Sequence, residues 1–185
     1  MHRLFVALRP PPAIRAVLRR VMGGVRAARW QDDEQLHLTL RYIGEVDRRT
    51  AEEVALAMVQ VRTAPITITL AGVGAFDKRG RVDALWAGVT PHDALAVLHR
   101  KVDHALVRLS LAPERRAYLP HVTLGRLPRG VGVALEVDRW RAAHAGLSSA
   151  PCTFDHLYLY ESHLGAEGAR YDVVGCWPLA RIAVE

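Results

Sequence analysis

Hydrophobic and polar residues alternate in several short segments of this chain, which is the pattern of strands with one buried face. Residues 36–43 alternate over their whole length, and residues 66–70 alternate again ahead of a turn at 77–80. Because residues 82–89 form another apolar segment directly after that turn, we expect the two segments to pair as a hairpin. Strands are also predicted at 3–8, 119–127, 154–160 and 171–177.

Apolar residues at helical spacing predict four helices between these strands. They follow Pro10–Pro12 and lie at Thr50–Val61, Thr90–Leu109 and Leu135–His144. Thr50 and Glu53 form a capping-box pattern at the start of the second helix. Strands outnumber helices and occur as hairpins, which favours an α+β fold of mostly antiparallel sheet. Because no Gly/Ser-rich linker interrupts the pattern, we expect a single domain over residues 1–185.

One four-residue unit, His-x-Thr-Leu, occurs at residues 37–40 and again at 121–124, 84 residues later in a chain of 185. Each copy lies on a predicted strand, so a duplicated lobe would relate the two copies by a pseudo-twofold axis. Side chains alternate across a strand, which places the histidine and the threonine of each copy on one face. A strand that is polar on one face and aliphatic on the other fits the wall of a wet cleft.

Two histidines that face each other across such a cleft, His37 and His121, can divide the work of phosphodiester hydrolysis. One neutral imidazole takes a proton from water while the other, as imidazolium, protonates the leaving oxygen. Histidine suits both tasks because its unperturbed pKa lies near ~6.5. The hydroxyls of Thr39 and Thr123 can donate hydrogen bonds to the phosphate oxygens. A single such motif is more often structural, whereas a matched pair indicates function.

The chain shows no signature of a metal site or of a nucleotide cofactor, and the sequence predicts neither. Cys152 and Cys176 lie far apart without ligand-spaced partners, and His99 and His104 are five residues apart, which does not match the spacing of a shared metal on a helix. No Gly-rich phosphate loop follows a strand, and Ser148 lacks the flanking glycines of a serine hydrolase.

Charge and hydropathy narrow the possible partners. Lys and Arg number 25 against 19 Asp and Glu, for a net charge of +6, and only Lys78 and Lys101 are lysines. Arginine holds phosphate with a flat pair of donors, so the composition permits an RNA or nucleotide partner, although codon bias accounts for it equally well. No apolar run is long enough to cross a membrane, and no signal-peptide pattern follows the N-terminus, so we expect a cytoplasmic protein.

The segments around the two motifs carry a resemblance to a known family. They are residues 3–8 followed by prolines, 37–44, 118–126, and 159–162 with Gly168 and Tyr171. Over nearly its whole length the chain resembles the two-histidine (2H) phosphoesterase superfamily, and within it the RNA 2′,3′-cyclic phosphodiesterase family, also called the 2′-5′ RNA ligase family. It has Tyr42 and Tyr118 where the family commonly has phenylalanine.

This resemblance implies a bilobal fold, with outer helices around a central cleft. It also implies hydrolysis of a terminal 2′,3′-cyclic phosphate to a 2′-phosphate without metal. It assigns His37 as the proton donor to the departing 3′-oxygen and His121 as the proton acceptor from water. The two motifs are nearly symmetric, so the residues alone leave these roles interchangeable.

Two arginines compete as phosphate ligands. Arg126 matches an arginine that the family uses near the phosphate. Strict alternation places it on the face opposite His121 and Thr123, unless the strand ends or bulges there. Arg41 follows His37 and Thr39 on the same face by alternation, and is the better placed of the two on that ground.

The sequence therefore predicts a metal-independent phosphodiesterase that opens RNA 2′,3′-cyclic phosphates and, with a 5′-hydroxyl in place of water, runs in reverse as a 2′-5′ ligase. Two alternatives stay open. The same site can act on 2′-5′-linked oligonucleotides or nucleotide cyclic phosphates, or the chain can be an RNA- or nucleotide-binding module without turnover. We expect a monomer whose partner is an RNA or an oligonucleotide.

Overall fold

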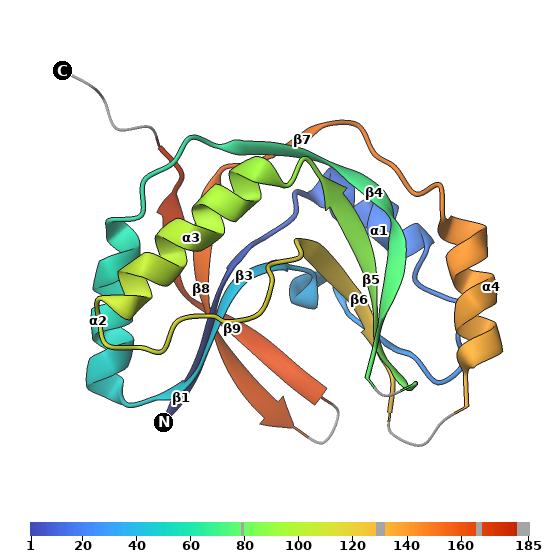
Figure 1. The fold of residues 1–185 in the computed structure, drawn as a ribbon, viewed down its shortest axis with the longest axis horizontal. Helices are drawn as coiled ribbons and strands as arrows, with labels where there is room; N and C mark the ends of the chain where they lie inside the picture. The colour runs from blue at the N-terminus through green and yellow to red at the C-terminus, as the bar shows by residue number, and fades with distance from the viewer. Residues whose placement is uncertain (79, 129–131, 166–167, 181–185) are drawn as a thin grey trace.

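The computed structural model describes residues 1–78, 80–128, 132–165 and 168–180. Strands and helices alternate along the chain much as the hydrophobic pattern predicts (Figure 1). The elements are β1 (His2–Leu8), α1 (Pro12–Arg20), β2 (Arg29–Trp30), the 3₁₀ turn η1 (Asp33–Gln35), β3 (Leu38–Val46), α2 (Arg48–Val59), β4 (Ile66–Asp77), β5 (Val82–Thr90), α3 (Asp93–Val107), β6 (His121–Arg126), α4 (Ala134–His144), β7 (Cys152–Phe154), β8 (His156–Gly165) and β9 (Gly168–Pro178).

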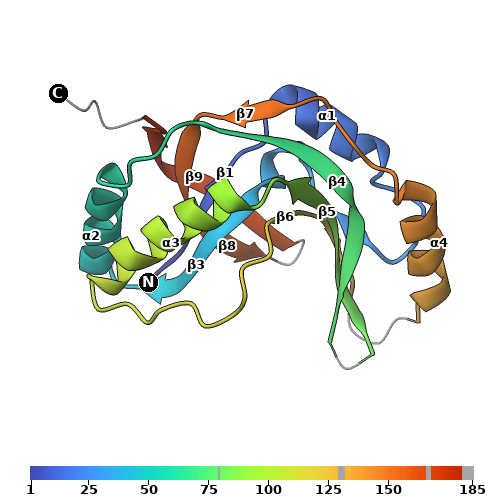
Figure 2. The ribbon, with the colours of Figure 1, turned by 45° about the horizontal axis from the view of Figure 1, so that its top comes forward.

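Within the described residues the strands form one nine-stranded sheet in the order β7-β4-β5-β6-β3-β1-β8-β9, with β2 added beside β6. Every pairing in it is antiparallel. The order is symmetric about the junction of β3 and β6, since β1 and β8 on one side correspond to β5 and β4 on the other. The sheet curls, and the helices lie outside it (Figures 1 and 2). The expected bilobal α+β fold is confirmed.

The core lies between the sheet and the helices. Along β1, Leu4, Val6 and Leu8 are buried in the main core, whereas Phe5 and Ala7 pack on the opposite face with Tyr160. α2 and α3 cover the half of the sheet that contains β1 and β3, and α4 packs against β4 in the other half. One face of the curled sheet is therefore occupied by helices, which leaves the motif side chains on the other.

The start of α2 differs from the sequence prediction. Asp47, not Thr50, is the N-cap residue, and its Oδ1 accepts a hydrogen bond of 2.7 Å from the backbone N–H of Thr50. Thr50 is already the third helical residue, so the capping box expected from Thr50 and Glu53 is wrong. An aspartate three residues before the expected cap satisfies a free N–H group of the first turn.

Among the described residues, no helix is both long enough and apolar enough to pass through a bilayer.

Candidate active site

The two His-x-Thr motifs meet where the halves of the sheet join. β3 and β6 are paired at Leu38 and Val122, which are the middle residues of the two motifs. In an antiparallel ladder this register places His37 beside Thr123 and Thr39 beside His121. All four polar side chains are half-buried, while Leu38 and Val122 are fully buried. The pseudo-twofold axis therefore runs through the centre of the site, with one histidine on either side.

Both motif strands are irregular at the same position. On β3, the ladder to β1 steps from Thr39 to Arg41 while β1 advances by one residue, so Leu40 is an extra, unpaired residue. On β6, the ladder to β5 makes the same step across Leu124. Each β-bulge reverses the alternation of the residues that directly follow it, up to the next irregularity of the ladder. Strict alternation therefore holds for the histidine and threonine of each motif but fails beyond its leucine.

The bulge at Leu124 resolves the position of Arg126. It returns Arg126 to the face of His121 and Thr123, and the charge of this guanidinium lowers the pKa of both His37 and His121. An arginine that acts electrostatically on both imidazoles lies near both of them. Arg126 is thus brought together with the four motif residues.

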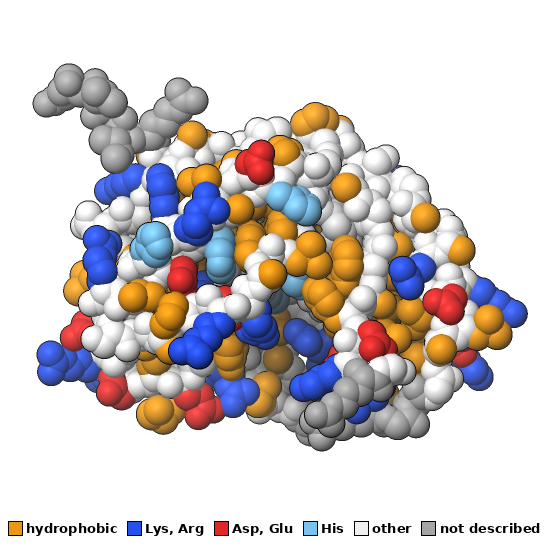
Figure 3. Space-filling view, viewed as in Figure 1, with side chains coloured by type: hydrophobic (Ala, Val, Ile, Leu, Met, Phe, Trp, Pro, Cys, Tyr) orange, Lys and Arg blue, Asp and Glu red, His pale blue; other side chains and the backbone are white. Residues whose placement is uncertain are grey.

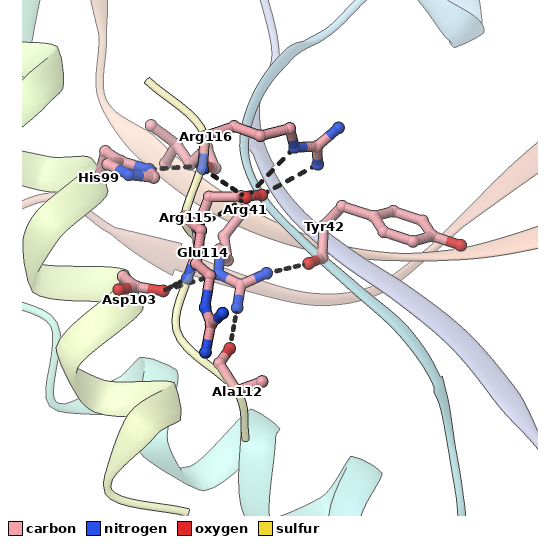
Figure 4. A network of polar contacts seen from close by, with 9 residues as sticks. Arg41, Tyr42, His99, Asp103, Ala112, Glu114, Arg115 and Arg116 are labelled. Atoms are coloured by element: carbon pink, nitrogen blue, oxygen red, sulfur yellow. Dashed lines mark hydrogen bonds and ion pairs between the residues drawn. The ribbon is translucent and has the colours of Figure 1, made fainter. Parts of the chain in front are cut away.

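The bulge at Leu40 turns Arg41 away from the site. Its guanidinium donates to the carboxylate of Asp103 at 2.7 Å and to the backbone carbonyls of Tyr42 and Ala112, as Figure 4 shows. Only 10% of the Arg41 side chain is exposed. The expectation that Arg41 shares the face of His37 and Thr39 is wrong, because the bulge interrupts the alternation on which it rested. Tyr42 takes that face instead and is 45% exposed.

Arg41 should therefore matter for stability and not for the site. Replacing Arg41 with methionine leaves the Asp103 carboxylate buried without its partner, which should lower the free energy of unfolding by about 3–5 kcal/mol. Urea denaturation measures this loss, and calorimetry with inorganic phosphate at a temperature where the variant is folded should give an unchanged Kd. Arg126→Met is the matched control and should give the reverse pattern. A higher Kd for phosphate in Arg41→Met would show instead that Arg41 contributes to phosphate binding.

The two imidazoles are oriented by equivalent hydrogen bonds. Nδ1 of His37 lies 2.7 Å from the carbonyl oxygen of Gln35, and Nδ1 of His121 lies 2.7 Å from that of Leu119. A carbonyl oxygen only accepts, so each Nδ1 carries the proton and donates it. Nε2 is then the free nitrogen of each neutral ring, and it can accept a proton. In both halves the histidine uses Nδ1 for this bond, and the accepting carbonyl belongs to the residue two positions before the histidine.

The carbonyl that orients His37 is itself held in place. The side chain of Asp32 accepts a hydrogen bond from the backbone N–H of Gln35 at 2.9 Å, and the Gln35 side chain accepts one from the Asp32 N–H at 3.0 Å. This reciprocal capping box closes η1 directly before the first motif. Gln35 also donates through Nε2 to the carbonyl of Ala169 on β9. The segment before His37 is thus tied to a distant strand.

Aromatic rings pack around both histidines. Phe5 and Tyr171 lie 4.8 and 5.2 Å from the ring of His37, and Phe76 meets His121 edge-on at 4.8 Å, between ring centroids. Burial against these groups lowers the pKa of His37 to about 4, with further lowering by the charges of Arg126 and His121. Burial is also the main cause of the lowered pKa of His121. Both rings are therefore neutral in the empty site at pH 7.

A cavity of about 430 Å³ opens beside His121 and Thr39. Its far wall comes from the segment after α3, and its lining includes Tyr42, Phe76, His99, Glu114, Arg116 and Tyr118. In Figure 3 this face of the molecule is hollowed at its centre, and a histidine side chain is visible at the edge of the hollow. The sequence did not reveal that most of these residues, including His99, line one cavity, because they come from different elements without a shared spacing. Among the described residues, no three His, Cys, Asp or Glu side chains are grouped so as to hold a metal ion.

Together, the fold and the site define a class of two-lobed α+β proteins in which paired His-x-Thr strands meet in a cleft, as in two-histidine phosphoesterases. The sequence profile of the 2′-5′ RNA ligase superfamily matches residues 10–166. The chain belongs to this superfamily.

Proteins similar to this chain carry a common name. It is 29% identical over 154 residues to the RNA 2′,3′-cyclic phosphodiesterase of Geobacillus stearothermophilus, covering 81% of this chain and 47% of that protein. It is 26% identical over 183 residues to a protein of the same name from Methanocaldococcus jannaschii, covering 95% of this chain and 99% of that protein. The chain thus spans about half of the first relative, at 47%, and nearly all of the second, at 99%.

A solved structure agrees with the fold. The crystal structure of Escherichia coli LigT complexed with 3′-AMP has a TM-score of 0.76 and 23% identity, covering 97% of this chain and 99% of that one.

Proposed function

We propose that this protein hydrolyses the terminal 2′,3′-cyclic phosphate of RNA to a 2′-phosphate, without a metal ion. The observation that carries the proposal is the symmetric pair of imidazoles at one junction, each with Nδ1 bonded to a backbone carbonyl and Nε2 free. Such a pair supplies one proton acceptor and one proton donor. The names of its relatives supply the substrate, since both are called RNA 2′,3′-cyclic phosphodiesterase.

In this mechanism His121 is the proton acceptor and His37 the proton donor. Nε2 of His121 removes a proton from water as the water oxygen attacks phosphorus. The bond between phosphorus and the 3′-oxygen breaks, and that oxygen takes the proton from Nε2 of His37. The product has a 2′-phosphate and a free 3′-hydroxyl. The protons then exchange with solvent, which restores the starting state of both rings.

His37 must carry a proton on Nε2 to act as the donor, although burial holds its pKa at about 4 in the empty site. The negative charge of a bound phosphodiester opposes the positive charge of Arg126 and so raises the pKa of His37. Substrate binding thereby favours the protonated donor. The same anion is held by the hydroxyls of Thr39 and Thr123 and by the guanidinium of Arg126, which stabilise the charge that grows in the transition state.

The same acid and base serve the reverse reaction, in which a 5′-hydroxyl replaces water and a 2′-5′ linkage forms. The alternatives keep the cleft but change its use, to 2′-5′-linked oligonucleotides, to nucleotide cyclic phosphates, or to RNA binding without turnover. Intact histidine and threonine in both motifs favour turnover over binding alone.

The test is incubation of pure protein with a short RNA that ends in a 2′,3′-cyclic phosphate, in the presence of EDTA. Phosphorus NMR of the product should show a 2′-phosphate. A 3′-phosphate would contradict the proposed bond cleavage, and activity that EDTA removes and a divalent metal restores would contradict metal independence. Unchanged RNA with hydrolysis of a nucleotide cyclic phosphate would favour the alternative substrates.

A further inference from the structure

A second concave surface lies outside the cleft, between the C-terminal end of α2 and α3. We call it the basic groove. It has a volume of about 610 Å³, and its basic lining consists of Arg62, Lys101 and Arg108, with the His104 side chain beside them. Among the described residues no carboxylate lines it, and all four of these side chains are exposed. The groove therefore gathers positive charge without a counter-charge in its own lining.

The cations of the groove differ in this respect from the arginines of α2. On α2, whose end borders the groove, Arg48 and Arg49 pair with Glu52 and Glu53 at 2.9 and 3.0 Å. By contrast, in the part of the chain that the structure describes, the cations of the basic groove make no ion pair. Like charges gathered in this way repel one another, and an anion that binds among them relieves the repulsion.

One of these cations is fixed by the fold. Nζ of Lys101 donates to the backbone carbonyl of Arg62 at 2.6 Å, which ties α3 to the end of α2. The ammonium group keeps two further donors for a ligand. An anion in the groove would therefore meet a positioned charge as well as the exposed guanidinium groups of Arg62 and Arg108.

The groove and the cleft lie on opposite sides of α3. His99 of α3 lines the cleft cavity, whereas Arg108 directly after the same helix lines the groove. Nine residues separate these positions by about 14 Å along the helix and by about half a turn around it. In Figure 3, Lys, Arg and His side chains gather over α2 and α3 beside the central hollow. A polyanion that ends in the cleft can reach the groove by crossing over α3, a distance that a few nucleotides of RNA span.

We propose that the basic groove binds the phosphate backbone of the RNA whose cyclic-phosphate end lies between His37 and His121. This inference rests on the proposed function and deepens it, because it makes an RNA chain, and not a mononucleotide, the preferred substrate. Guanidinium and ammonium groups bind successive phosphates without reading the bases. The position of the groove across α3 from the cleft, within reach of a chain held at its end between the two histidines, favours RNA over an acidic protein as its occupant.

The experiment compares a mononucleotide 2′,3′-cyclic phosphate with an RNA of about twelve nucleotides that ends in the same nucleotide. The variant combines Arg62→Gln, Lys101→Gln and Arg108→Gln. Its kcat/KM for the mononucleotide should equal that of the wild type. For the RNA, kcat/KM should fall roughly tenfold or more at low salt. The slope of log kcat/KM against log salt should shrink by about two units, since each phosphate that the variant no longer neutralises accounts for about 0.7.

The matched control combines Arg48→Gln, Arg49→Gln and Arg141→Gln, which remove the same charge from exposed ion pairs elsewhere. It should leave the RNA kinetics and the salt slope unchanged. If kcat/KM for the RNA falls equally in both variants, or in neither, the groove does not bind the RNA. Either result leaves the proposed function intact.

Direct binding of the same RNA, labelled with fluorescein and measured by anisotropy, tests the groove even if no substrate is turned over. Loss of RNA affinity in the groove variant alone supports the inference. A polyglutamate peptide that binds the wild type as tightly as the RNA would overturn it in favour of an acidic protein partner.

Discussion

Replacing either His37 or His121 with alanine is expected to lower kcat for the RNA cyclic phosphate by about 10²–10⁴-fold, because each variant loses one positioned proton transfer. KM should change far less, since in the proposed mechanism Thr39, Thr123 and Arg126 hold the phosphate without either imidazole. The double variant should be little slower than either single one, because the two transfers act in one step. His156→Ala, which removes an exposed histidine paired with Asp155, is the control and should keep the wild-type rate.

The two single variants also separate the roles of the histidines. In a phosphodiester of 4-nitrophenol, the leaving group departs as the 4-nitrophenolate anion. Its departure needs no protonation and therefore no proton donor. On that substrate, His37→Ala should regain most of the wild-type rate while His121→Ala stays slow. Recovery of His121→Ala instead would exchange the roles, and wild-type rates of both variants on RNA would contradict a two-histidine mechanism.

Replacing Arg126 with methionine should lower kcat/KM by about 10²–10³-fold, because the variant loses the charged donor that we propose for the phosphate. It should also move the pH profile. The positive charge of Arg126 lowers the pKa of both histidines, so its removal raises both. In the wild type both pKa values lie below the usual 6.5, which places the maximum of kcat/KM below that pH, and in the variant the maximum should shift upward.

Arg126→Lys is the control that separates charge from shape. It keeps the positive charge, so the pH maximum should stay low, but it loses the two-pronged geometry, so kcat should still fall. Proton NMR titration of the histidine rings measures the pKa values independently of turnover. A pH maximum of Arg126→Met that coincides with the wild type would contradict electrostatic coupling of Arg126 to the imidazoles.

The strands and both motif histidines could be predicted because they depend on a short-range pattern. Alternation over residues 36–40 and 120–124 fixes which side chains share a face, and the structure has His37 and Thr39 where this pattern predicts them. The pairing of the two motifs follows from their repetition, since equivalent strands of duplicated lobes tend to meet at the axis. Long helices with strong periodicity, such as α3, were equally accessible from the sequence.

The bulges could not be predicted, and they decide between Arg41 and Arg126. A bulge depends on how one strand pairs with its neighbour, and Leu40 and Leu124 are ordinary buried leucines in the sequence. Strict alternation fails beyond the leucine of each motif for this reason. β2 and β7 were missed because two or three residues are too few to show a period. The far wall of the cleft was missed because residues 112–119 have no regular structure.

The pairing of β3 with β6 through Leu38 and Val122 has a mechanical consequence. Each half of the sheet is stiffened by long ladders, such as those of β8 with β9 and of β4 with β5. The halves are joined along β3 and β6 by a far shorter ladder, directly beneath the two histidines. A rotation about this line would change the gap between the imidazoles while the ladders on both sides stay intact. The width of the group that fits between the two rings therefore depends on the shortest junction of the sheet.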